Sequence, residues 1–270
     1  MRVTDCHTHL KGECDPSAVL KQMDANAVDR IILYSPSERR SLDTTRDNLL
    51  QCKKLFDAAP DRITGLAFVN PTIAGMAELV EEALTDFGFT GVKIIPDHWF
   101  AYEERLEPFW ERMHRLHARI MFHTGILYAN DDSSRFNRPV YLEKLLHYPN
   151  IRFAMAHLSW PWLEEHLAVM GRMRAAAERG GHDWQSYSDI TPGMPPHIHK
   201  QALANAVSYV GPERMMWGSD TSISADGARM ENQAFRLETD VALLREIGLD
   251  PEEIARVMSG TADELFPPRR

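Results

Sequence analysis

The sequence predicts a closed (β/α)8 barrel in which residues 1–270 form a single domain. Eight short, largely apolar runs of strand character alternate with amphipathic runs of helical character, which is the pattern of a parallel sheet covered by helices on both faces. A length of 270 residues suits such a barrel. The segment after the first run reads HTHLKGE, without the glycine-rich phosphate loop that an open, nucleotide-binding sheet usually carries there.

The predicted strands are recognised by their apolar residues and by the turn signals that bound them. In chain order they are residues 2–7, 30–34, 63–69, 92–95, 120–123, 152–157, 186–190 and 215–218. Prolines at 16, 161 and 251 mark helix starts, because proline is favoured at the first helical position. Asp15 precedes the first of these prolines as a cap residue, and Asp250 precedes the last.

The composition excludes several classes of partner. Thirty Lys and Arg against 39 Asp and Glu give a formal net charge of −9, which disfavours binding to nucleic acid or to an anionic membrane surface. No apolar run reaches the roughly 18 residues that a membrane span needs, and a strand starting near residue 2 leaves no room for a signal peptide. Cys6, Cys14 and Cys52 are too few for a disulfide framework. We therefore expect packing cysteines in a cytoplasmic protein.

Histidines and carboxylates recur where the predicted strands end. His7 and His9 are two residues apart, so they share one face of the first strand. The carboxyl ends of barrel strands carry the active site, and the other polar residues at those ends or within the strands are Lys93, His123, His157, Asp189 and Asp220. We expect them to meet at one rim, where Asp189 is either a site residue or only a hydrogen-bonding partner of the rim.

A divalent metal ion would explain such a cluster. Several buried imidazoles and a carboxylate cost desolvation free energy when they have no partner. Imidazole nitrogen and carboxylate oxygen are natural zinc ligands, and three or four protein ligands with an open position make a catalytic site. The cysteines are badly placed for a structural zinc site. The sequence therefore predicts a catalytic metal centre.

The motifs DCHTH, GVKI, FHTG, AHLSW and GSD, in this order on successive strands, resemble the amidohydrolase superfamily. More narrowly, they are similar to its amidohydrolase 2 branch, which is related to aminocarboxymuconate semialdehyde decarboxylase. The resemblance covers the whole chain to its closing GTADELF. It implies His7, His9, His123 and Asp220 as metal ligands, and Asp220 as proton acceptor. His157 would stand beside the metal and polarise the substrate or its water.

The resemblance implies one divalent ion, zinc first with manganese as the alternative. A second ion would require Lys93 to be carboxylated; otherwise Lys93 would contact the substrate. The implied reaction is addition of water, whose pKa falls towards about 7 on such a metal, to a small carboxylated or cyclic lactone, amide or ester. Non-oxidative decarboxylation of an aromatic or muconate-like acid is the alternative. A small-molecule substrate is the expected partner, and a homodimer is compatible with the branch.

Loop residues offer further candidates for substrate binding. Arg135 and Arg138 could clamp a carboxylate or be solvated surface residues. His98 could reach the pocket from the loop after the fourth strand. Trp160 could wall an unsaturated ring or pack in the core. The remaining histidines are expected to be structural or solvated, or at the surface in helices and loops: His114, His117, His147, His166, His182, His197 and His199.

Overall fold

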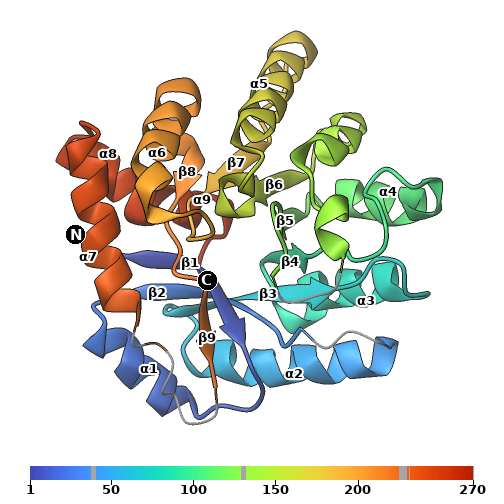
Figure 1. Ribbon diagram of the computed structural model, residues 1–270. Coiled ribbons are helices and arrows are strands. Elements are labelled where there is room, and N and C mark those ends of the chain that lie inside the picture. Colours follow the sequence, from blue (N-terminus) through green and yellow to red (C-terminus); the bar gives the residue numbers. More distant parts are fainter. Residues whose placement is uncertain (38–40, 129–131, 225–229, 231, 270) are drawn as a thin grey trace.

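The computed structural model is a (β/α)8 barrel, in which helices surround a ring of parallel strands (Figure 1). It describes residues 1–37, 41–128, 132–224, 230 and 232–269. The strands are β1 (Thr4–Leu10), β2 (Arg30–Tyr34), β3 (Ile63–Val69), β4 (Gly91–Ile94), β5 (Arg119–Phe122), β6 (Arg152–Met155), β7 (Ser186–Asp189), β8 (Met215–Met216) and β9 (Thr221–Ile223). Neighbours in the chain pair in parallel from β1 to β8, and β9 pairs with β1.

The ring is closed by an eighth strand in two parts. Residues 215–218 were expected to form this strand, but β8 ends at Met216 and the chain resumes as β9 only at Thr221. The Cys6 N–H donates to the Trp217 carbonyl at 3.0 Å, which joins the end of β8 to β1. The four residues between the two parts therefore leave the hydrogen-bond ladder at the carboxyl edge of the ring.

The helices are α1 (Pro16–Ala25), α2 (Leu42–Ala58), α3 (Met76–Glu82), α4 (Glu107–Arg115), α5 (Leu163–Gly180), α6 (Pro196–Val210), α7 (Asn232–Glu246), α8 (Pro251–Ala255) and α9 (Thr261–Leu265). Asp15 and Asp250 cap α1 and α8 as predicted, the latter in a capping box with Glu253. The prediction that Pro161 starts a helix is wrong, because α5 begins two residues after it. In the described ranges, no helix is both long and apolar enough to cross a membrane.

Alternate residues of each strand face two different cores. In β2, Ile31 and Leu33 belong to the large core between the sheet and the helices, whereas Ile32 and Tyr34 belong to the smaller core inside the ring. This alternation follows from the two-residue period of a strand. Cys6 lies in the inner core. The inner core fills the ring below the rim, so that polar side chains at the carboxyl ends of the strands lie above an apolar floor.

His166 is buried, although the sequence suggested a surface position on a helix. It lies in α5 with its ring between two hydroxyl groups, Ser159 Oγ at 2.8 Å from Nδ1 and Ser188 Oγ at 2.8 Å from Nε2. Burial lowers the pKa of His166 to about 3. Helical spacing alone did not reveal this position, because the partners of the ring come from the turn after β6 and from β7.

The buried His166 makes the protein less stable as the pH falls. Its pKa is about 3 in the folded chain and about 6.5 in the unfolded chain, so the unfolded chain binds the extra proton between these values and unfolding is favoured as the pH falls. We expect the free energy of unfolding of the wild type to drop by about 2 kcal/mol more than that of His166→Gln between pH 7 and pH 5.

Urea unfolding at the two pH values measures this difference. His147→Gln, which changes an exposed histidine, is the control and should keep the pH dependence of the wild type. Equal losses of stability in the wild type and in His166→Gln would contradict the assignment.

Candidate active site

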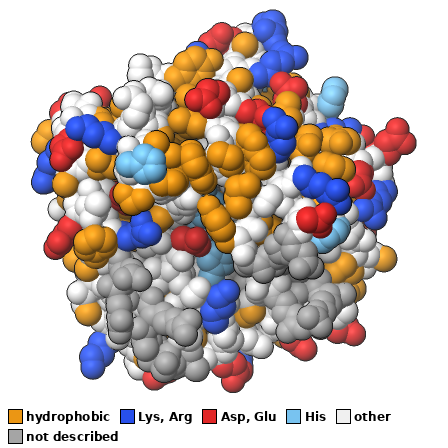
Figure 2. All heavy atoms as spheres, viewed as in Figure 1, with side chains coloured by type: hydrophobic (Ala, Val, Ile, Leu, Met, Phe, Trp, Pro, Cys, Tyr) orange, Lys and Arg blue, Asp and Glu red, His pale blue; other side chains and the backbone are white. Residues whose placement is uncertain are grey.

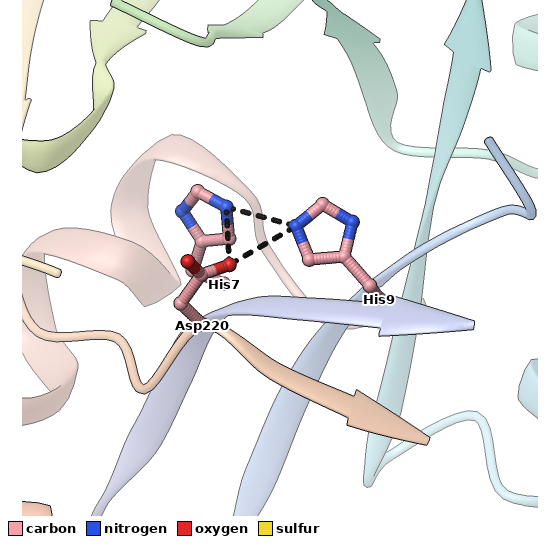
Figure 3. A group of neighbouring side chains, drawn as sticks. All are labelled: His7, His9 and Asp220. Atoms are coloured by element: carbon pink, nitrogen blue, oxygen red, sulfur yellow. Dashed lines mark hydrogen bonds and ion pairs between the residues drawn. The ribbon is translucent and has the colours of Figure 1, made fainter. Parts of the chain in front are cut away.

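Three side chains from the two ends of the chain meet at the carboxyl edge of the ring (Figure 3). His7 Nε2 lies 3.2 Å from His9 Nε2, and Asp220 Oδ1 lies 3.5 Å from the first and 3.2 Å from the second. The two histidines share a face of β1, as their spacing predicts. Asp220 comes from the break between β8 and β9, where its φ of 58° is left-handed, a conformation that aspartate tolerates better than most residues.

A buried carboxylate, Asp5, links the two parts of this group, which are the histidines of β1 and the segment that carries Asp220. Its Oδ1 accepts hydrogen bonds from the backbone N–H groups of His7 and Ser219, each at 3.0 Å, and its Oδ2 accepts from Gln233 Nε2 at 2.6 Å. Burial raises the pKa of Asp5, and these donors oppose the rise. The sequence argument did not single out Asp5. Its signal was an acidic residue inside a strand with buried neighbours.

Asp189 lies behind His7 as a hydrogen-bonding partner of its ring and is not among the residues that line the cavity. Its Oδ2 is 2.6 Å from His7 Nδ1, both side chains are buried, and its Oδ1 accepts the Thr191 N–H at 2.6 Å. Contact with Asp189 occupies Nδ1 and leaves Nε2 of His7 for His9 and Asp220. The pKa of His7 is lowered well below its usual value, first by burial and then by the charge of Lys93.

His123 and His157 lie beside this group. The two rings are 5.0 Å apart between centroids, and the His157 ring is also 5.0 Å from that of His7. His157 Nδ1 donates to the Pro192 carbonyl at 3.0 Å, because a carbonyl oxygen only accepts. Burial lowers the pKa of His157 to about 4. Its Nε2 therefore carries a lone pair at neutral pH.

The backbone at His157 is also left-handed, with φ of 59° there, 44° at Leu158 and 55° at Ser159. Such conformations cost of order 1–3 kcal/mol each and persist where surrounding structure fixes them. Ser159 Oγ donates to Thr124 Oγ1 at 2.8 Å and also contacts His166. This buried hydroxyl network fixes the turn that presents His157.

A cavity of about 330 Å³ is lined by His7, His9, His123, His157 and Asp220. Lys93 and Trp160 are part of its wall, with Phe68 and Ile126 as apolar neighbours. Lys93 is fully buried, and its Nζ lies 4.8 Å from the ring centroid of Tyr34. Figure 2 shows the face drawn in Figure 1, with hydrophobic side chains across its middle and a histidine visible at the centre.

The structure does not bring Arg135, Arg138 or His98 to this cavity. Arg138 pairs with Glu165, and Arg135 lies 3.5 Å from Asp132. His98 pairs with Asp97 at 2.7 Å and with Asp132 at 3.4 Å. All three side chains are exposed and engaged with acids of the protein itself. The predicted carboxylate clamp is thus replaced by surface ion pairs, which sequence spacing does not distinguish from a clamp.

The donor set fits a divalent cation. Ligand bonds of 2.0–2.2 Å in tetrahedral geometry place ligand atoms about 3.3–3.6 Å apart, close to the 3.2–3.5 Å found among His7, His9 and Asp220. His123 Nε2 is buried in the same cavity and has no hydrogen-bond partner within the described part of the chain. A buried polar atom without a partner needs an explanation, and a shared cation would supply one.

Gly218 lies in the break of the eighth strand, where it packs directly against the first strand. A Cβ built on Gly218 would lie 2.7 Å from His7 Cβ and 3.1 Å from Cys6 Sγ. We expect Gly218→Ala to lower the free energy of unfolding by about 1–3 kcal/mol, because His7 must move within a packed core. Urea unfolding measures it. Gly260→Ala, whose new Cβ would meet only the flexible side chain of Arg256, should lose none of this stability.

Three solved structures share the fold over nearly their full lengths. One is a 2,6-dihydroxybenzoate decarboxylase with 2,6-dihydroxybenzoate, with a TM-score of 0.66 and 12% sequence identity over 98% of each chain. Another is a probable 2-pyrone-4,6-dicarboxylic acid hydrolase from Acinetobacter baumannii with citric acid, with a TM-score of 0.65 and 17% identity over 98% of this chain and 99% of that one. A third is an amidohydrolase from Burkholderia multivorans with zinc, with a TM-score of 0.68 and 13% identity over 100% of each chain. A search of curated proteins found no match. The amidohydrolase model Amidohydro_2 matches residues 4–267. The chain therefore belongs to the amidohydrolase 2 family.

Proposed function

We propose that the protein is a metal-dependent hydrolase that adds water to a small carboxylated or cyclic substrate, such as a lactone, amide or ester. One observation carries the proposal. Asp220 places a carboxylate oxygen within 3.5 Å of two imidazole nitrogens at the wall of a cavity. This arrangement combines the ligands of a cation with a base for water.

His7, His9 and Asp220 would hold the ion, with His123 as a fourth ligand. Zinc is our first choice because nitrogen and oxygen donors suit it, and the similar Burkholderia multivorans structure contains zinc. Manganese is the alternative. When bound, such an ion lowers the pKa of water and polarises a carbonyl group. A second ion would require a carboxylated Lys93.

Asp220 is suited to accept the proton of the attacking water. Burial by itself would raise its pKa, but the hydrogen bond with His9, together with the charges that His157 and His9 carry at low pH, lowers it to about 2. The carboxylate is therefore ionised at neutral pH. Its role as a base depends on its position beside the water, because a carboxylate with so low a pKa is only a weak base.

His157 has a narrower role than the sequence suggested. With Nδ1–H held by the Pro192 carbonyl, the neutral ring presents an acceptor at Nε2. It can orient a water O–H or receive a proton, whereas donation to an oxyanion would need the doubly protonated ring. We therefore assign His157 to the orientation of water or of a substrate hydroxyl group.

The cavity indicates an anionic substrate. Lys11 and Lys93 line it, and Asp220 is the only carboxylate among its described lining residues. Phe68 and Trp160 provide apolar walls, which suit the flat faces of a ring. A compact carboxylated ring fits both features.

Decarboxylation is the second candidate, and the similar 2,6-dihydroxybenzoate decarboxylase structure favours it. On this chain the same cations would hold the carboxylate of an aromatic acid. Release of carbon dioxide from a panel of aromatic and unsaturated acids, compared with ring opening of carboxylated lactones, separates the two reactions.

Removal of a ligand should abolish the activity and the metal together. His7→Ala and Asp220→Ala are each expected to lower turnover at least about 100-fold and to lower the metal content of protein purified without chelator, while the circular dichroism spectrum stays that of the wild type. Elemental analysis and a lactone hydrolysis assay measure the two effects. His197→Ala, which changes an exposed residue of α6, is the control. Full turnover by a metal-free protein would contradict the proposal.

A further inference from the structure

A second cavity adjoins the first. It has a volume of about 930 Å³ and lies between the break in the eighth strand, the start of α6 and the first turns of α7. The two cavities share four lining residues, which are Pro192, Gly193, Asp220 and Ser222. Asp220 therefore stands at the junction between them. A substrate longer than the first cavity would extend past this carboxylate into the second.

Arg236 of α7 is the only lysine or arginine among the described residues that line the second cavity. In the described ranges it makes no hydrogen bond and no ion pair. The arginines expected to bind substrate behave differently, since Arg135 and Arg138 are each paired with an acid of the protein. A half-buried guanidinium that faces a cavity without a partner has its planar donors available for a ligand.

The surroundings of Arg236 are arranged for a ligand with an apolar part. Phe235, also on the cavity wall, leaves 70% of its surface exposed and can cover the apolar part of such a ligand. His199 contributes a half-buried ring from α6. Burial first, and then the charge of Arg236, lowers the pKa of His199, so that it is a neutral hydrogen-bonding group.

The acidic residues of the cavity leave Arg236 available. Asp240 Oδ2 accepts the indole N–H of Trp217 at 2.9 Å, and its side chain is buried. Burial raises the pKa of Asp240 to about 6, although the hydrogen bond from Trp217 and the charge of Arg236 oppose the rise. Asp220 is engaged with His7 and His9 at the junction. Neither carboxylate lies within ion-pair distance of Arg236 in the described structure.

We infer that the second cavity binds a distal carboxylate of an elongated substrate, with Arg236 as the specificity-determining residue and His199 beside it. The inference rests on the proposed function, since it names the substrate class of the same site. The first cavity offers Lys11 and Lys93 to one anionic end, and Arg236 receives the other. The bond that is broken then lies between two carboxylates, beside Asp220.

Binding of simple diacids tests this inference without turnover. Linear α,ω-dicarboxylates from succinate to suberate, and monocarboxylates of the same lengths, are titrated into the purified metal-loaded protein by calorimetry. We expect one length of diacid to bind more tightly than its monocarboxylate. Arg236→Gln should lower the affinity for that diacid by about 10- to 100-fold, which is the usual contribution of a hydrogen bond between charged groups. The affinity for the monocarboxylate should stay the same.

Arg245→Gln is the matched control, because Arg245 is exposed near the other end of the same helix. It should bind every acid as the wild type does. Diacids that bind no better than monoacids, or an Arg236→Gln variant that weakens both classes equally, would overturn the inference. Hydrolysis and diacid preference are separate readouts: loss of turnover in Asp220→Ala bears on the reaction, whereas the Arg236→Gln comparison bears only on the second cavity.

Discussion

The structure of the site depends on one buried carboxylate and its donors. Asp5 has no access to solvent, so it must find its hydrogen bonds within the protein. They come from β1 itself, from the break in the eighth strand and from α7, through His7, Ser219 and Gln233. The same carboxylate therefore ties the ends of the barrel together, fixes the backbone of His7 and holds the residue next to Asp220. The hydrogen bonds that close the ring are therefore the same ones that position the site.

Much of this was predictable from local patterns. The runs at 30–34 and 63–69 are β2 and β3 without change, because strands buried on both faces are apolar throughout. The pairing of His7 with His9 follows from the two-residue period of a strand. The meeting of these residues with Asp220, across more than two hundred residues, follows from the barrel, in which all strands end at one edge.

What could not be predicted depends on contacts between distant segments. Arg135 and Arg138 have the spacing of a clamp, but Asp132 of the same loop engages the first and Glu165 of α5 engages the second. His166 has the position of a surface histidine, but two serines from other elements enclose its ring. Arg236 belongs to no sequence motif, and only its place on the wall of the second cavity suggests a role for it. The contacts that decide these positions come from the three-dimensional arrangement of the elements, about which neither periodicity nor spacing carries information.

The interruption between β8 and β9 has a consequence for what a substitution there can do. Residues 217–220 lie outside the run of interstrand pairing, and the Cys6–Trp217 hydrogen bond preserves closure beside them. Ser219 bonds to Asp5, and Gly218 packs against His7, so a replacement in this segment would change the position of Asp220 and the fit against β1 together. The opening between the two cavities and the stability of the barrel are therefore coupled through the same four residues.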